Sequence, residues 1–282
     1  MRTYVPDPDA FEVDTAAGSF ACLGWGEGPL VVLVHGFPDT ARTWDLVGPR
    51  IAEQGFRVVA PFTRGIAPTP VPADGDYRND RLGQDVLDLI EALGETSAIV
   101  VGHDFGASAA YAAAGLGGPE RVRKLVTVAI PHPATLKPGL GVLWGARHFL
   151  THKLPGAPGR FAAHDFAQMR VLYERWSPGF DWPDAELEHA KNSYSAPGCC
   201  DAAMGYYRAL ALAPSPGLRA RIGSPTLIVG GETDGVARAA DFEASRSRFT
   251  GPVDVLMVPG GHFLHREHPE PFLDVLLPFL SA

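Results

Sequence analysis

The chain has 282 residues and a formal net charge of −8, with 46% hydrophobic and 20% charged residues. A chain of this length can bury a substantial core, in one large domain or in one domain with an insertion, and this composition is typical of globular proteins and not of disordered ones. The negative charge argues against nucleic acid or an anionic membrane as the main partner.

Two further features bear on location. The three cysteines, Cys22, Cys199 and Cys200, show neither a disulfide framework nor metal-ligand spacing, which favours a reducing compartment. Residues 1–10 lack the apolar core of a signal peptide, and no apolar run reaches the ~20 residues that a membrane helix needs. We therefore expect a cytoplasmic protein with no membrane partner.

Short apolar strands alternate with amphipathic helices along most of the chain. The pattern predicts a β-hairpin over residues 11–23 and a continuous apolar strand at 30–34, which is typical of strands covered on both faces. Further strands are expected at 56–60, 97–101, 123–130, 225–230 and 253–258, and helices at 43–54, 78–93, 105–116, 236–249 and 269–280. This alternation predicts an α/β fold with a mostly parallel sheet flanked by helices.

The alternation stops between residues 131 and 216. This stretch contains Trp144, Trp176 and Trp182, four tyrosines and many prolines, whereas a linker would be poor in aromatic residues. We interpret it as a helical lid, or cap, over the ends of the strands. The predicted organisation is a core formed by residues 1–130 and 217–282, with a cap at 131–216.

Asp104 lies between Gly102 and Gly106, where a predicted strand meets a predicted helix. This is the pattern of a nucleophile elbow, a sharp turn that raises one side chain above the edge of the sheet. The glycines would leave room for strand and helix to approach. Because the apex residue is Asp, the predicted nucleophile is a carboxylate, which would form an ester with an sp³ carbon. On this motif alone, a solvated Asp in an ordinary turn is the alternative.

Two more candidates follow the last two predicted strands, where open α/β sheets bind ligands. His262 follows the strand at 253–258 and is the candidate base, whereas His265 and His268 lie at a helix start, where we expect solvated side chains. Asp234 follows the strand at 225–230, and its spacing favours it over Glu232 as the acid that orients the base.

The segment His35-Gly36-Phe37-Pro38 ends the strand at 30–34. The backbone N–H groups of Phe37 and Phe105 could face the same space and stabilise an oxyanion. His35 itself is expected to connect loops, and His103 is expected to support the site without entering it.

These residues together resemble the α/β-hydrolase superfamily, over roughly residues 11–280. The chain order of nucleophile, acid and histidine matches that superfamily. Within it, the Asp apex resembles the soluble epoxide hydrolases and haloalkane dehalogenases. Dehalogenases usually hold the halide with Trp after the nucleophile and often with Asn after His-Gly, where this chain has Phe105 and Phe37. The Arg that follows the nucleophile in fluoroacetate-type dehalogenases is also absent, so the motifs favour an epoxide hydrolase.

The resemblance implies two hydrogen-bond donors in the cap for the epoxide oxygen. The segment Gly205-Tyr206-Tyr207-Arg208 is similar to the family segment that carries one donor, which indicates Tyr207. Residues 148–156 are similar to the segment that carries the other, and they place His148 where a tyrosine is usual; a minority of this branch pairs His with Tyr. Tyr173 or Tyr194 is the alternative second donor.

The resemblance further implies a vicinal diol product, formed through an Asp104 ester that is hydrolysed by water activated by His262. It implies no cofactor and no metal. The aromatic cap favours a small, mainly apolar substrate, and a homodimer remains open. The alternatives are a haloalkane or haloacid dehalogenase with the same triad and, in another class, a non-catalytic ligand receptor on a hydrolase scaffold.

Overall fold

A computed structural model describes residues 7–136, 147–211 and 213–282, with the side chains of residues 147 and 148 left out. An eight-stranded sheet with the order β1-β2-β4-β3-β5-β6-β7-β8 forms its centre. β2 pairs antiparallel with β1 and β4, and the other neighbours are parallel. The strands are β1 (Asp9–Thr15), β2 (Gly18–Trp25), β3 (Leu30–Val34), β4 (Arg57–Pro61), β5 (Ala98–His103), β6 (Val122–Val128), β7 (Thr226–Gly231) and β8 (Val253–Val258).

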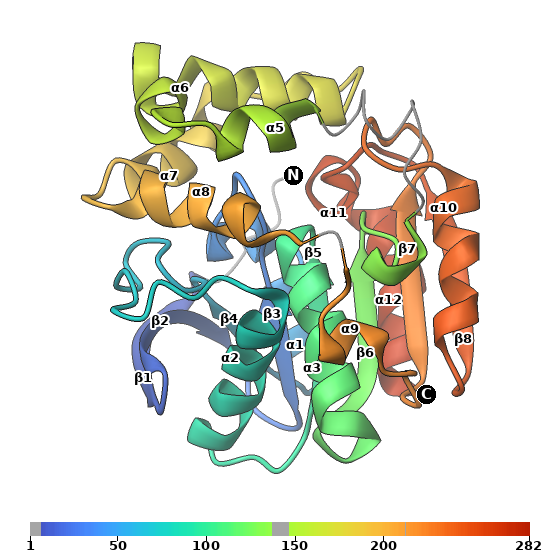
Figure 1. Ribbon diagram of the computed structural model, residues 1–282. Helices are drawn as coiled ribbons and strands as arrows, with labels where there is room; N and C mark the ends of the chain where they lie inside the picture. Colours follow the sequence, from blue (N-terminus) through green and yellow to red (C-terminus); the bar gives the residue numbers. More distant parts are fainter. Residues whose placement is uncertain (1–6, 137–146, 212) are drawn as a thin grey trace.

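Helices cover both faces of the sheet (Figure 1). One face carries α1 (Gly48–Ala52) and α12 (Pro269–Ser281), and the other carries α2 (Asn79–Ala92), α3 (Phe105–Arg121) and α10 (Ala239–Ala244). Short elements complete the core: η1 (Ala41–Trp44), η2 (Pro133–Thr135), α9 (Pro216–Arg219), η3 (Ser245–Arg248) and α11 (Leu264–Glu267). The α/β class with a mostly parallel, helix-flanked sheet is confirmed.

Among the described residues between β6 and β7 are four helices that Figure 1 shows grouped beyond one end of the sheet. They are α5 (Arg147–Lys153), α6 (Ala157–Trp176), α7 (Asp184–Tyr194) and α8 (Cys199–Ala209), and we call them the cap helices. Within the described ranges, no helix is both long and apolar enough to cross a membrane.

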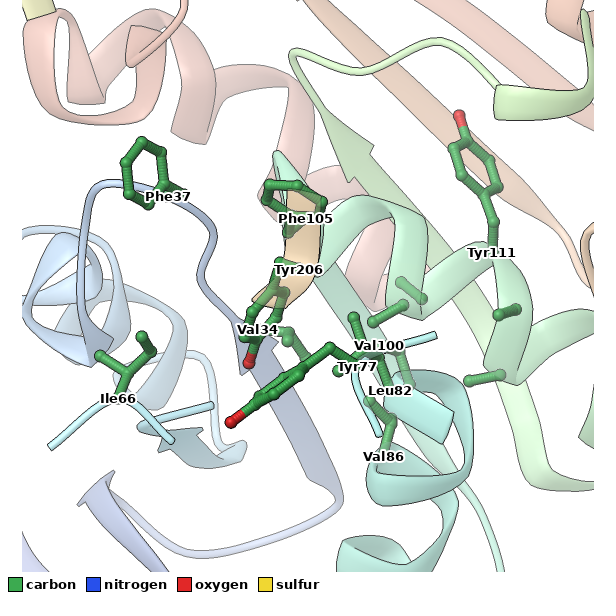
Figure 2. Close-up of a cluster of buried hydrophobic side chains, with 14 of the residues drawn as sticks. Val34, Phe37, Ile66, Tyr77, Leu82, Val86, Val100, Phe105, Tyr111 and Tyr206 are labelled. Atoms are coloured by element: carbon green, nitrogen blue, oxygen red, sulfur yellow. The ribbon is translucent and has the colours of Figure 1, made fainter. Parts of the chain in front are cut away.

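The strands supply alternate side chains to two hydrophobic cores. In β3, Val32 and Val34 belong to the core under α2 and α3, whereas Val31 and Leu33 belong to the core under α1 and α12. This period of two is that of a pleated strand, and burial on both faces explains the continuous apolar run. Figure 2 shows part of the core on the α2 side, including Val34, Leu82, Val86, Val100, Phe105 and Tyr206.

Two expected helices differ from the observed ones. The helix expected at 43–54 is divided into η1 and α1, because Pro49 has no N–H to continue a helical ladder. The helix expected at 236–249 begins only at Ala239. The Asp234 carboxylate accepts hydrogen bonds from the amides of Val236 (2.6 Å) and Ala237 (3.4 Å), and this holds those residues in a turn.

Candidate active site

Asp104 occupies a sharp turn between β5 and α3. Its φ of 54° and ψ of −120° are values that residues other than glycine rarely adopt. A Cβ added to Gly102 would lie 2.2 Å from the carbonyl oxygen of Gly106, and one added to Gly106 would lie 2.1 Å from that of Val34. The close approach of strand and helix therefore requires both glycines. The turn presents the Asp104 carboxylate at the carboxyl end of β5.

His262 lies between two carboxylates. Its Nε2 atom is 3.3 Å from Oδ2 of Asp104, and its Nδ1 atom is 3.2 Å from Oδ2 of Asp234. The three residues follow β5, β7 and β8, whose parallel arrangement puts their carboxyl ends at one edge of the sheet. Glu232, the other candidate acid, is exposed to solvent. The structure therefore brings together the three residues that the sequence singled out.

The charges in this trio stabilise one another. Burial disfavours the charged form of His262, but Asp234 and Asp104 outweigh burial and raise the pKa of His262 to about 10. Burial disfavours the charged form of Asp104 as well, but its hydrogen bond to His262 and the histidine charge lower its pKa. The free site is therefore an imidazolium between two carboxylates at neutral pH.

The loop after β3 supplies a donor to Asp104. The backbone N–H of Phe37 donates to Oδ1 of Asp104 over 2.9 Å. The amide of Phe105 is the first N–H of α3, and the first amides of a helix have no acceptor within the helix.

His35 holds this loop in place. The amide of Thr63 donates to His35 Nε2 over 2.9 Å, so Nδ1 carries the proton and donates to the carbonyl oxygen of Gly36, also over 2.9 Å. Burial lowers the pKa of His35 to about 4, and the ring is therefore neutral. His35 connects the loop to the segment that follows β4, in line with the expectation that it connects loops.

Tyr207, on the cap helix α8, covers the site and is almost completely buried. Its ring packs edge-on against the rings of Phe37 and Phe105, with centroids 5.1 Å and 5.0 Å away. Burial and the negative charge of Asp104 raise the pKa of Tyr207 well above its ordinary value. The hydroxyl therefore keeps its proton over the physiological pH range and can act as a donor.

The other expected cap donors have different positions. The side chain of His148 lies outside the described residues. The hydroxyl of Tyr173 is 3.4 Å from the carbonyl oxygen of Pro38, and that of Tyr194 is 3.4 Å from the carbonyl oxygen of Asp39. Both tyrosines therefore bind the backbone of the loop that follows Phe37.

His152 is a residue that sequence reasoning missed. It lies one helical turn beyond His148 on α5, and its buried ring packs 4.6 Å from that of Tyr207 and 5.4 Å from that of Phe37. Burial, together with nearby arginines, lowers its pKa to about 4, which keeps the ring neutral. The available signal was its spacing of four residues from His148, which predicts the same face of a helix.

One expectation about the remaining histidines is wrong. His265 is completely buried, and its Nε2 atom lies 2.8 Å from the hydroxyl of Thr43, whereas His268 is exposed as expected. The short helix α11 packs against η1, and this contact removes His265 from solvent. His103 also lies beneath the site, with Nε2 2.9 Å from the carbonyl oxygen of His262.

Arg266 connects the cap to the loop after Phe37 and was not predicted. This buried guanidinium donates to Asp39 Oδ2 over 2.8 Å and to Glu186 Oε2 over 2.7 Å. A small apolar cavity lies beside Phe37 and Phe105 and reaches cap residues of α7 and α8. Across the described part of the chain, no group of three or more metal-ligating side chains is arranged to hold a metal.

Comparisons with known proteins place this geometry in context. A family model described as the alpha/beta hydrolase fold matches residues 29–269. Epoxide hydrolase 3 of Mus musculus is 28% identical over 271 residues, which cover 93% of this chain and 73% of that protein. The solved structure of a candidate alpha/beta hydrolase from Nostoc sp PCC 7120 is 28% identical, with a TM-score of 0.85 over 98% of both chains. Epoxide Hydrolase A from Mycobacterium thermoresistibile has a TM-score of 0.83 over 98% of both chains at 23% identity, a level that carries the fold alone.

Proposed function

Because this chain belongs to the α/β-hydrolase fold family and is a hydrolase, we propose that it opens an epoxide to a vicinal diol through a covalent ester on Asp104. The observation that carries the proposal is the position of His262, 3.3 Å from the Asp104 carboxylate and 3.2 Å from that of Asp234. Tyr207 lies near enough to Asp104 for the carboxylate charge to raise the pKa of its hydroxyl. Relatives named epoxide hydrolases support the same substrate class.

In the first step, Oδ2 of Asp104 attacks an epoxide carbon and the carbon–oxygen bond of the ring breaks. The hydroxyl of Tyr207 donates its proton to the departing oxygen, a kind of assistance that contributes typically ~10²–10⁴-fold. Oδ1 stays with the amide of Phe37, its hydrogen-bond partner in the free site. The ring of His152, also in the cap, packs edge-on against the ring of Tyr207.

The second step releases the ester. Esterification removes the negative charge of Asp104, which helps to hold the proton on His262. The imidazolium therefore gives up its proton, which replaces the one that Tyr207 donated, and the neutral imidazole can then accept a proton from water. Water attacks the ester carbon, and the oxyanion on Oδ1 is stabilised by the amides of Phe37 and Phe105. The tetrahedral intermediate then collapses, and Oδ2 leaves with the diol and receives the proton from His262. The carboxylic acid that remains passes its proton to His262, which restores the Asp104 carboxylate and the imidazolium of the free site. Asp234 holds the imidazole in orientation throughout.

A single-turnover reaction in ¹⁸O-labelled water tests this route. We expect the label in the Asp104 carboxylate and unlabelled oxygen in the diol of the first turnover. Label in the diol with none in Asp104 would show direct attack of water and rule out the ester. The variant His262→Gln should accumulate the ester to about one equivalent, since the base acts only in the second step.

A halide-release assay, run beside a panel of epoxides, separates the competing functions. Halide release from haloalkanes, with no diol from an epoxide panel, would indicate a dehalogenase that uses the same three residues. The rings of Phe37 and Phe105 count against that outcome, because they offer no side-chain donor for a halide. Tight binding of ligand with neither ester nor product would indicate a receptor.

A further inference from the structure

The carboxyl end of the cap helix α6 lies between the two loops that carry Asp234 and His262. The carbonyl oxygen of Trp176 accepts hydrogen bonds from the amides of Gly235 and His262, each 3.0 Å long. One backbone oxygen of the cap thus binds the residue after the proposed acid and the proposed base itself. The separation of the two loops therefore depends on where this cap residue lies.

The contact is between backbones on both sides. A Cβ added to Gly235 would lie 2.2 Å from the carbonyl oxygen of Arg175, and one added to Gly261 would lie 2.4 Å from Cα of Ser177. Only glycine allows the loops to approach the cap so closely. The end of α6 is therefore seated against both loops with no intervening side chain.

Glu267, on α11, completes this arrangement. Its Oε1 atom accepts from the hydroxyl of Ser177 (2.5 Å) and the amide of Phe263 (3.0 Å), and its Oε2 atom accepts from the amide of Gly261 (2.8 Å). The hydroxyl oxygen of Ser177 lies 3.2 Å from the same Phe263 amide. The amides of Gly261 and Phe263 flank His262 in the sequence. The buried Glu267 carboxylate therefore binds the loop on both sides of His262, and through Ser177 it connects this loop to the cap.

We propose that Glu267 and Ser177 are positioning residues for His262, which align the base with Asp104 only while the end of α6 is seated between the two loops. This inference rests on the proposed ester mechanism. Ester formation requires Asp104 and the cap donor, whereas ester hydrolysis also requires a base at the correct place. Loss of this support should therefore slow the second half-reaction and leave the first unchanged.

The test measures the two half-reactions separately, by rapid quenching and intact-protein mass spectrometry with an epoxide that gives a detectable ester. For Glu267→Gln and Ser177→Ala we expect ester formation within about threefold of the parent rate and ester hydrolysis slowed roughly 10–100-fold, the size of effect produced by small misplacements of catalytic groups. Glu267→Asp keeps the carboxylate and should hydrolyse the ester faster than Glu267→Gln.

Two matched controls are available. Glu270→Gln removes an exposed carboxylate three residues further along the chain, and Ser195→Ala removes an exposed hydroxyl of the cap. Both should leave the two rates at the parent values. These controls show whether a change of charge or the loss of any cap hydroxyl is sufficient to slow hydrolysis.

Each result decides the question. Ester hydrolysis at the parent rate in both Glu267→Gln and Ser177→Ala overturns the inference while the proposed function stands, and so does an equal slowing of both steps, which would indicate general destabilisation. If Glu267→Gln fails to fold, Ser177→Ala, which loses only a hydroxyl, carries the test. Absence of any ester in the parent protein and in His262→Gln would instead remove the proposed function itself.

Discussion

The Nε2 atom of His262 lies 3.3 Å from Oδ2 of Asp104, although 158 positions separate the two residues in the chain. The contact makes the protonation of each residue depend on the other. It holds a proton on the histidine of the free protein, and the proposed chemistry requires that this proton leave once Asp104 carries the substrate.

The first prediction concerns the titration of His262, followed by ¹⁵N–¹H NMR of the imidazole. In the parent protein its pKa is raised to about 10, so the ring should stay charged well above neutral pH. Asp104→Asn should lower this pKa, because one of the two supporting carboxylates is lost. Asp234→Asn should lower the pKa of His262 by more than Asp104→Asn does, since Asp234 exerts the largest stabilising effect on the charged ring. An unchanged titration in both variants would contradict the charge coupling described here.

The second prediction separates the cap groups. Tyr207→Phe should slow ester formation by about 10²–10⁴-fold, because the departing oxygen loses its donor, and should leave hydrolysis of ester already formed nearly unchanged. His152→Phe tests the histidine that packs against Tyr207, and His148→Phe is its matched variant one turn away. We expect His152→Phe to slow ester formation more than His148→Phe. The reverse order would restore His148 as the partner of Tyr207.

The third prediction concerns stability in acid. Burial lowers the pKa of four histidines to about 3 or 4, namely His35, His103, His132 and His152. Their unfolded pKa is about 6.5, so below that pH the unfolded chain binds protons that the folded chain does not, and the free energy of unfolding falls as pH falls. Each histidine contributes about 1.4 kcal/mol per pH unit to this slope.

His132 provides the variant for this measurement, because it lies outside the candidate site and caps η2 through Nδ1, which accepts from the amide of Ala134. In His132→Asn, the slope between pH 6 and pH 4.5, from urea unfolding, should fall by about 1.4 kcal/mol per pH unit. Equal slopes in the parent protein and in this variant would contradict the prediction. His262 has the opposite effect, because its pKa is raised in the folded protein. Its contribution to the free energy of unfolding is complete below pH 6.5 and is lost as pH rises through about 10.

The fourth prediction concerns the turn at Asp104. Gly106→Ala would place a methyl group 2.1 Å from the carbonyl oxygen of Val34, so we expect a loss of roughly 1–3 kcal/mol or more in stability, and a loss of ester formation as the turn shifts. Gly159→Ala on α6 meets nothing within 4 Å and should stabilise the protein by about 0.5–1 kcal/mol, through the better helix propensity of Ala. Thermal unfolding compares the two variants. Equal melting temperatures would show that the strand and helix can move apart.

The sequence predicts those parts of this protein that depend on local patterns. Buried strands appear as apolar runs, and polar residues directly after them lie at one edge of a parallel sheet, so Asp104, Asp234 and His262 could be placed before the structure was known. Arg266 and Glu267 could not, because charged side chains near a helix start are usually solvated, and here they bind partners far along the chain. His265 was misjudged for the same reason: its burial depends on a contact with Thr43, 222 positions away.

The hydrogen bonds of the Trp176 carbonyl bear on the exchange of caps between members of this family. A chimaera built on a foreign cap would bring its own backbone oxygen to the gap between the loops that carry Asp234 and His262, together with its own walls for the substrate. Specificity transferred in this way would come with an altered rate of the proposed ester hydrolysis, unless the graft leaves residues 175–177 in place. Points of exchange should therefore be chosen before the last turn of α6, and not at the following β7.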